Sequence, residues 1–318
     1  MKKWQWAIAV GLCILLVFTA VFGYNLYQQY KNTLEAISVT EPIDENEGEE
    51  GKAGGSEEMK PFVMLLYGIS AREHIGDKGR SDTMMLALVD PDEVKVSLIS
   101  IPRDAYVEIP RYRMDKINAA YPRGGSSLMM ETIENWLDVE LHGFASINFQ
   151  GFIDLVDLFG GIDVEVSRRM EYDDPYDGTR IRLYPGEQTL DGKNALDFVR
   201  FRQSNDGRHA SDYDRMKRQQ QALQSLSQEI TSIRSLTRAF DMMNILSENV
   251  QTSLTSYELE KLIRIFLSFK PEELETTSIQ GEGYYHNGGW YERIPQEEVQ
   301  RIQQIIADFL EEENENLS

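Results

Sequence analysis

Basic residues gather at three places in this chain, and the spacing at each place suits an anion. Arg103 comes directly after a long apolar run and a proline, where we expect a strand to end. Arg200 and Arg202 alternate, so in an extended segment both guanidinium groups would point to one side. Arg215 and Arg218 are three residues apart near the start of a predicted helix and would share a face. Guanidinium groups fit phosphate oxygens in a forked geometry, so the three clusters together predict one pyrophosphate or polyphosphate pocket.

A carboxylate near these arginines would allow a metal ion to bind with the phosphates. Asp82 precedes another apolar run, and Mg²⁺ binds through one or two protein carboxylates plus phosphate oxygens. Asp82 is therefore a candidate magnesium ligand, although a turn or cap role explains the same residue. Each arginine could likewise pair with a separate carboxylate, because the chain has 53 acidic residues. The sequence has no Walker loop, GxGxxG, HExxH or GxSxG motif. It therefore lacks the usual motifs of nucleotide hydrolysis, dinucleotide binding, zinc proteolysis and serine hydrolysis.

The overall composition narrows the function further. Lys and Arg number 32 against 53 Asp and Glu, which gives a formal net charge of −21. A nucleic-acid binder draws its affinity mainly from a basic surface, so we expect no nucleic-acid partner. Cys13 is the only cysteine, which excludes a disulfide scaffold, and four histidines leave little room for a zinc site.

The first thirty residues predict a membrane anchor. Trp4–Tyr24 is an uncharged apolar run of 21 residues. As a helix it would be about 31 Å long and would cross the hydrocarbon core of a bilayer. We take residues 4–30 as the anchor. Lys2 and Lys3 precede it, so the positive-inside rule places residues 1–3 in the cytoplasm and the chain after about residue 30 outside the cell. A cleaved signal peptide is the competing interpretation, but the run is long and no small-x-small site follows it.

Beyond the anchor, the composition divides the chain into a stalk and a domain. Residues 31–60 are acidic and poor in apolar side chains, so we expect a disordered stalk. Residues 61–318 hold short apolar runs typical of strands, and segments of helical periodicity between them. The predicted strands are Phe62–Gly68, Thr83–Asp90, Val94–Ile101, Phe144–Phe149 and Ile162–Val166, and the predicted helices are Gln150–Leu158, Ser126–Leu137, Asp191–Val199, Asp212–Ile233 and Pro295–Glu312. The turn at Asp90–Glu93 makes the second and third strands an antiparallel hairpin. These elements predict one large α/β domain with a mixed central sheet between helices.

Several motifs, in register along the chain, carry a family resemblance. They are RSDTM (Arg80–Met84), SIPRD (Ser100–Asp104), KINAAY (Lys116–Tyr121), GEQTLDGKNALDFVRFR (Gly186–Arg202) and the helix start Arg215–Gln219. Over about residues 61–225 the chain resembles the LytR-CpsA-Psr family, and the predicted anchor and outward orientation match that family as well.

The resemblance implies a phosphotransferase at the outer face of the cell membrane of a Gram-positive-type envelope. Such proteins take an anionic glycopolymer, such as wall teichoic acid, from an undecaprenyl pyrophosphate carrier. They join it through a phosphodiester to a hydroxyl of peptidoglycan. The family fold is a mixed sheet between helices, with a hydrophobic channel for the polyprenyl tail. By resemblance the pyrophosphate would be held by Arg103, Lys116, Arg200, Arg202, Arg215, Arg218 and Gln219, and the catalytic residues would be Arg103, Arg200, Arg202 and Asp82.

Two departures from the family pattern bear on this chemistry. The family has an aspartate after the first strand that serves a Mg²⁺ site together with the residue matching Asp82, and here that position is Ser70. We therefore expect weaker Mg²⁺ binding, through Asp82 and the pyrophosphate or with help from Glu73 or Asp77. The second departure is an insertion over residues 203–214, which would reshape the acceptor side. Two other functions stay open: a catalytically weakened polyprenyl-phosphate binding or regulatory cell-envelope protein, and a carrier pyrophosphatase with water as the acceptor.

Overall fold

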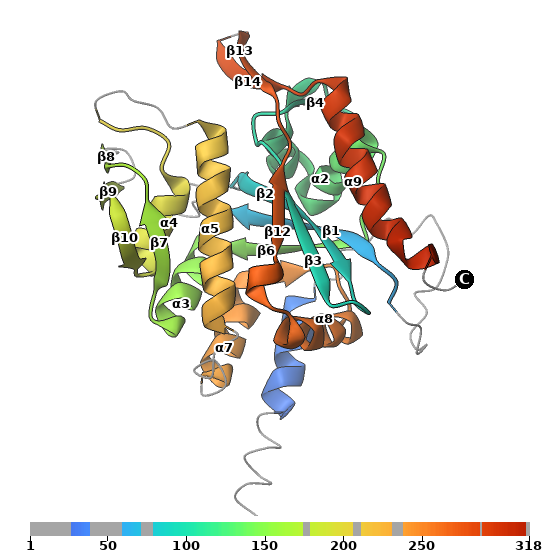
Figure 1. Ribbon diagram of the computed structural model, residues 1–318, viewed down its shortest axis with the longest axis vertical. Coiled ribbons are helices and arrows are strands. Elements are labelled where there is room, and N and C mark those ends of the chain that lie inside the picture. Colours follow the sequence, from blue (N-terminus) through green and yellow to red (C-terminus); the bar gives the residue numbers. More distant parts are fainter. Residues whose placement is uncertain are drawn as a thin grey trace, which may run out of the picture.

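A six-stranded mixed sheet forms the centre of the fold (Figure 1). The structure, a computed structural model, describes residues 27–38, 59–70, 79–173, 179–205, 211–230, 238–286 and 288–315. In sheet order the strands are β11 (Val250–Thr252), β6 (Gly143–Asn148), β1 (Phe62–Ile69), β2 (Ser81–Asp90), β3 (Lys95–Ser100) and β12 (Glu275–Ser278). β1 pairs in parallel with β6, and β3 with β12, whereas the other neighbours are antiparallel. The mixed central sheet is as predicted.

The hairpin between β2 and β3 follows from the residues of its turn. Asp90 ends β2, and its Oδ1 accepts the backbone N–H groups of Asp92 and Glu93 at 2.9 and 3.0 Å. This side chain closes the turn before β3 begins at Lys95. The antiparallel pairing predicted for these two strands is confirmed.

Helices cover both faces of the sheet because strand side chains alternate between the faces. On β1, Val63, Leu65 and Tyr67 join one apolar core, whereas Phe62 and Met64 join another on the opposite face. The helices are α2 (Ala120–Leu137) and α9 (Gln296–Glu315) on the first face, and α5 (Asp212–Ile230) and α8 (Ser256–Ser268) on the second. Both faces are thereby withdrawn from water, and the sheet is the rigid platform on which the site is built.

A third apolar core lies beside the sheet, between it and the edge of the molecule (Figure 1). Its elements are α3 (Phe149–Phe159), β7 (Ile162–Val166), β10 (Gly186–Leu190), α4 (Gly192–Arg200) and one side of α5, with the small hairpin of β8 (Met170–Asp173) and β9 (Arg180–Leu183). β7 was expected among the strands of the central sheet, but it pairs only with β10 in a two-stranded sheet. Gly160, with a φ of 92°, ends α3 and turns the chain into β7.

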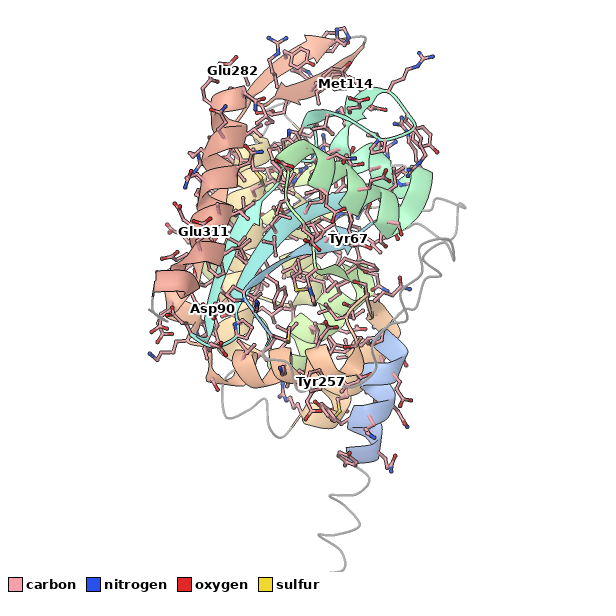
Figure 2. All side chains as sticks on the ribbon, turned by 90° about the vertical axis from the view of Figure 1, so that its right-hand side faces the viewer. Tyr67, Asp90, Met114, Tyr257, Glu282 and Glu311 are labelled. Carbon is pink, nitrogen blue, oxygen red and sulfur yellow. The ribbon has the colours of Figure 1, made fainter. Side chains whose placement is uncertain are left out.

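Two further hairpins lie at one end of the long axis (Figures 1 and 2). They are β4 (Tyr106–Glu108) with β5 (Met114–Lys116), and β13 (Glu282–His286) with β14 (Gly289–Arg293). The remaining elements are α7 (Ala239–Asn249) and two short 3₁₀ turns, Ile117–Ala119 and Pro271–Glu273. The strand patterns of the sequence predict neither hairpin, because each strand is short and mostly polar or aromatic.

The stalk prediction is wrong at its N-terminal end. Residues 27–37 form a helix that packs on the domain, with Leu34 and Ile37 buried. The hydroxyl of Thr33 also donates to the carbonyl of Met243 on α7 at 3.4 Å. Most of the predicted anchor and residues 39–58 of the predicted stalk lie outside the described residues. Within the described ranges, no helix combines the length and the apolarity needed to cross a membrane.

Candidate functional site

Arg103 stands on a tight turn just beyond the end of β3. The amide of Ala105 donates to the carbonyl of Pro102 at 3.1 Å, which closes a four-residue turn with Arg103 and Asp104 in the middle. The carbonyl of Asp104 in turn accepts the amide of Glu292 on β14 at 2.8 Å. The backbone below both charged side chains is therefore fixed, and Arg103 lies at a strand end as its sequence context predicts.

Arg103 is the buried centre of a partly buried ion-pair network drawn from four parts of the chain. The network consists of Asp82, Arg103, Asp104, Lys116, Asp212 and Arg215. Nη1 of Arg103 binds Oδ1 of Asp82 at 2.8 Å. Its Nε lies 3.7 Å from a carboxylate oxygen of Asp104 and 3.8 Å from one of Asp212. One guanidinium thus joins β2, the turn after β3 and the first residue of α5.

The outer members of the network complete two of these pairs. Lys116, the last residue of β5, places Nζ 2.7 Å from Oδ1 of Asp104. Arg215 pairs with Asp212 one turn earlier on α5. Three acids and three bases therefore balance in charge. The sequence-based prediction that Lys116 and Arg215 lie near Arg103 agrees with these positions.

Arg202 adds a further positive charge beside the balanced network. Its side chain is solvent-exposed, yet protein atoms crowd the guanidinium enough that desolvation, and then the charge of Arg103, lower the pKa of Arg202. The carboxylates of Asp104, Asp82 and Asp212 act in the opposite direction. Arg202 is therefore an exposed cation next to the network. The carboxylate of Glu292 also lies within electrostatic reach of the network, because burial and then the charges of Asp212 and Asp104 raise its pKa.

The electrostatics of Asp82 and Arg215 show how strongly the site is biased toward an anion. Burial acts to raise the pKa of Asp82, but the charge and hydrogen bond of Arg103 override it and hold that pKa below its usual range. Burial, followed by the charge of Arg103, lowers the pKa of Arg215 to about 10. Asp82 is therefore ionised at neutral pH, and Arg215 is a desolvated cation that an added negative charge would stabilise.

Three atoms of the network lack the hydrogen-bond partner that their burial demands. They are Nε of Arg103, Nε of Arg215 and Oδ2 of Asp212, none of which has a partner among the described residues. A buried polar atom without a partner costs about 1–3 kcal/mol, so each such atom calls for an explanation. Two N–H donors fit oxygens of a bound anion, and the carboxylate oxygen fits a hydroxyl or another proton donor. The site is arranged to receive both kinds of group.

Two predicted pocket residues on α5 are engaged in holding the structure. Arg218 donates Nε to the carbonyl of Phe198 at 2.8 Å, and a second N–H to the carbonyl of Phe201. Its guanidinium thereby ties the end of α4 to α5, and the charges of Arg215 and Asp212 act on it. A role of Arg218 in binding the anion stays a prediction. Gln219 donates Nε2 to the hydroxyl of Thr83 at 2.8 Å and connects α5 to β2 next to the network.

The predicted pair Arg200 and Arg202 is separated by the end of a helix. Arg200 is the last residue of α4, so the extended spacing that would aim both side chains alike does not apply. The Arg200 guanidinium lies over the ring of Phe149, 4.6 Å from the centroid, and its charge acts on Asp197. Of the two arginines, Arg202 is the one whose charge acts on the Arg103 network.

The candidate magnesium ligand Asp82 has a hydroxyl beside it in place of a second carboxylate. Oγ of Ser70 lies 3.4 Å from Oδ2 of Asp82 and donates to the carbonyl of Arg80 at 3.0 Å. Glu73 and Asp77, the predicted substitutes, lie outside the described residues. In the part of the chain that the structure describes, no three His, Cys, Asp or Glu side chains gather closely enough to hold a metal ion.

The structure adds residues that sequence reasoning missed. Asp212 was predicted to begin a helix and to lie in an insertion, but it was given no role at the site, although its spacing of three from Arg215 on that helix signals an ion pair. Tyr213, the next residue, donates its hydroxyl to Oε1 of Glu292 at 2.6 Å and accepts the amide of Gly281 at 2.5 Å. No sequence signal joins α5 to β14, which is 79 residues further along.

Comparison with known proteins places this chain in one family. The sequence profile described as the LytR_cpsA_psr family matches residues 21–308. The chain belongs to this family, as its motifs predict.

Relatives and solved structures agree with that assignment. A protein of Oceanobacillus iheyensis named polyisoprenyl-teichoic acid–peptidoglycan teichoic acid transferase TagU is 32% identical over 319 residues, which cover 98% of this chain and 96% of the relative. The crystal structure of Bacillus subtilis TagV has a TM-score of 0.66 at 30% identity, covering 80% of this chain and 99% of that one. A structure described as TagT bound to LIIa-WTA has a TM-score of 0.63 at 28% identity, with 80% and 94% covered.

Proposed function

We propose that this protein is a phosphotransferase that moves a teichoic acid-like glycopolymer from a polyprenyl pyrophosphate carrier to peptidoglycan. One observation carries the proposal: the buried Nε donors of Arg103 and Arg215 have no hydrogen-bond partner among the described residues, and they lie beside the exposed cation of Arg202. A pyrophosphate would accept hydrogen bonds from these guanidinium groups through its oxygens, and its negative charge would neutralise theirs. The names of the relatives, which specify transfer of teichoic acid to peptidoglycan, support the same reaction.

The reaction that fits the site is a displacement at the phosphorus next to the polymer. A hydroxyl oxygen of the acceptor sugar forms a bond to that phosphorus, the bond to the bridging oxygen breaks, and polyprenyl phosphate leaves with the electron pair. Arg103, Arg202 and Arg215 neutralise the charge that builds on the phosphate oxygens. Phosphoryl transfer depends mostly on such positioning and charge stabilisation, so no protein nucleophile is needed.

Asp212 is the side chain best placed to take the proton of the acceptor hydroxyl. Its Oδ1 is occupied by Arg215, whereas Oδ2 is buried and has no partner among the described residues. Asp82 and Asp104, the other two acids of the network, accept hydrogen bonds from Arg103 and Lys116. The free oxygen of Asp212 supports its assignment as the base.

Mg²⁺ is proposed as a weakly held cofactor. Asp82 has one carboxylate oxygen on Arg103 and the other near the Ser70 hydroxyl. A single carboxylate suits Mg²⁺ when phosphate oxygens supply further ligands, so Asp82 and the pyrophosphate together would hold the ion. When bound, Mg²⁺ would spread the negative charge of the pyrophosphate.

The proposed place of the reaction is the outer face of the cell membrane. This location rests on the apolar run Trp4–Tyr24 with Lys2 and Lys3 before it. A protein so anchored would meet a lipid-linked donor in the membrane and peptidoglycan outside it. Fractionation, with protease added to intact cells, tests this: an outside domain is digested and a cytoplasmic one is protected.

The deciding experiment offers the purified protein a lipid-linked teichoic acid donor and a peptidoglycan oligomer, with and without Mg²⁺. Covalent transfer of the polymer to the oligomer supports the proposal. Donor binding without transfer favours the alternative of a lipid-phosphate binding or regulatory protein, for which the missing carboxylate at Ser70 is the specific observation. Release of free phosphate-ended polymer as the main product would mean that water is the acceptor.

A further inference from the structure

The β13–β14 hairpin presents two large aromatic rings to solvent. Tyr285 is 63% exposed and Trp290 is 64% exposed, and these residues pair directly across the hairpin. Their ring centroids are 5.6 Å apart with the planes at 71°. Leaving such rings in water is unfavourable, so a contiguous exposed aromatic pair indicates a binding surface.

The exposed rings lie on the hairpin face that leads to the site. Side chains two residues apart on a strand share a face, so Trp290 and Glu292 point to the same side of β14, about 7 Å apart along the strand. Glu292 is buried where it accepts the hydroxyl of Tyr213, the residue after Asp212. The exposed pair therefore lies one step along β14 from a residue that contacts the start of α5, next to Asp212.

The other face of the hairpin packs in part against the domain. Tyr284 and Tyr291 pair across the strands and pack against Tyr106 of β4, with ring centroids 6.2 and 5.0 Å from it. The amide of Glu292 is also bound to the carbonyl of Asp104 in the site turn. Because one face is anchored to the domain, the hairpin holds the exposed pair in a fixed relation to the ion-pair network.

We propose that Tyr285 and Trp290 form a platform on which sugar rings of the acceptor, a peptidoglycan glycan strand, stack while its hydroxyl reaches the site. This rests on the proposed function. Flat aromatic rings with a polar edge suit pyranose rings, which have apolar faces and hydroxyls around the rim. The hairpin carries Glu282 and Glu292 against one full positive charge, Arg293, so it offers no cationic surface for the polyanionic teichoic acid donor.

The position of the hairpin also argues against a lipid surface as the occupant. The helix of residues 27–37, which follows the apolar N-terminal segment, lies at the opposite end of the long axis in both views (Figures 1 and 2). A membrane that holds that segment would be far from the hairpin. A glycan strand of the wall would approach from the hairpin end.

The test measures binding of a soluble peptidoglycan glycan oligomer to the full chain by calorimetry. The double variant Tyr285→Ala/Trp290→Ala is expected to bind about tenfold or more weakly, whereas Tyr285→Phe/Trp290→Phe, which keeps both rings, stays within about threefold of the parent. Tyr257→Ala removes an aromatic of 49% exposure on α8 at the other end of the molecule (Figure 2), and it is expected to bind like the parent. Melting curves show whether each variant is folded.

Equal glycan affinity in the parent and the folded double alanine variant overturns the proposal, as does a parent that binds no glycan. Loss of binding to anionic lipid vesicles, or loss of self-association, with glycan affinity unchanged also overturns it and assigns the rings to a membrane or a second copy. A parallel transfer assay separates the two proposals. Glycan binding that depends on the rings, in a protein without transfer activity, supports the platform and defeats the phosphotransferase.

Discussion

Replacing Arg103 with alanine tests whether the network is built to bind a pyrophosphate or only to hold the fold. The structural cost can be worked out from the partners that remain. Asp104 keeps Lys116, and Asp212 keeps Arg215, so only Asp82 loses its main partner. Breaking a fully buried ion pair costs about 3–5 kcal/mol, but the Asp82 side chain is 35% exposed. Solvent screening reduces the expected loss to about 1–2 kcal/mol, and to a fall in melting temperature of about 2–8 °C.

The catalytic cost of the same change should be larger. Removing one preorganised donor from developing negative charge lowers turnover by about 10²–10³-fold, or about 2.7–4 kcal/mol. Arg103→Ala should therefore remain folded at 25 °C while transfer to peptidoglycan falls by about two to three orders of magnitude. Arg111→Ala is the matched control, because Arg111 is 65% exposed and pairs with Glu131 away from the network.

Folding and chemistry are separated by measuring transfer rates alongside thermal unfolding and the affinity for a short-chain prenyl diphosphate. A folded Arg103→Ala protein whose transfer rate stays within about threefold of the parent rate would refute the assignment, because a missing donor should lower that rate by about 10²–10³-fold. So would an Arg111→Ala protein that loses as much activity as the Arg103 variant, because the effect would then be unrelated to the site.

Three further changes probe other parts of the account. Arg202→Ala should lower the transfer rate by about 100-fold, and Arg200→Ala should lower it much less; equal losses in the two variants would contradict the separation of these side chains. Ser70→Asp should reduce the Mg²⁺ concentration that half-activates transfer, because it adds a carboxylate next to Asp82; an unchanged Mg²⁺ titration would remove Asp82 from the metal site. Because the pKa of Asp82 is lower in the folded protein, ionised Asp82 stabilises the fold at pH values above its unfolded pKa of about 3.9. This stabilisation is lost as the pH falls through the lower pKa of the folded state. The parent should therefore melt above Asp82→Asn at neutral pH, with the gap closing in acid, and a gap independent of pH would argue against the ionised pair.

Much of the sheet could be predicted because residues close together in the sequence determine its strands and its turn. The apolar runs around Phe62–Gly68 and Thr83–Asp90 alternate between two buried faces, and Asp90 closes its own turn. Arg103 could be placed because a proline and a strand end restrict the backbone before it. Periodicity and turn residues are enough for such elements, and they carry the arginine to the edge of the sheet where the site forms.

The parts that could not be predicted depend on contacts between distant segments. The helix of residues 27–37 was interpreted as the end of the anchor and the start of the stalk. Its packing on the domain depends on distant contacts, such as that of Thr33 with Met243, 210 residues further along the chain. Arg218 shows the same limit within the site, because carbonyls at the end of α4 take its donors. Residue type and spacing predicted a set of anion-binding arginines, but they did not show that the Arg218 guanidinium would donate to backbone carbonyls at the end of α4.

The most direct measurement is a crystal structure of the protein with a prenyl diphosphate bound. The account predicts diphosphate oxygens within about 3 Å of Nε of Arg103 and Nε of Arg215, with the Arg202 guanidinium turned toward them. A diphosphate seated elsewhere, with both Nε groups still uncontacted, would contradict the claim that these arginines are assembled around a pyrophosphate.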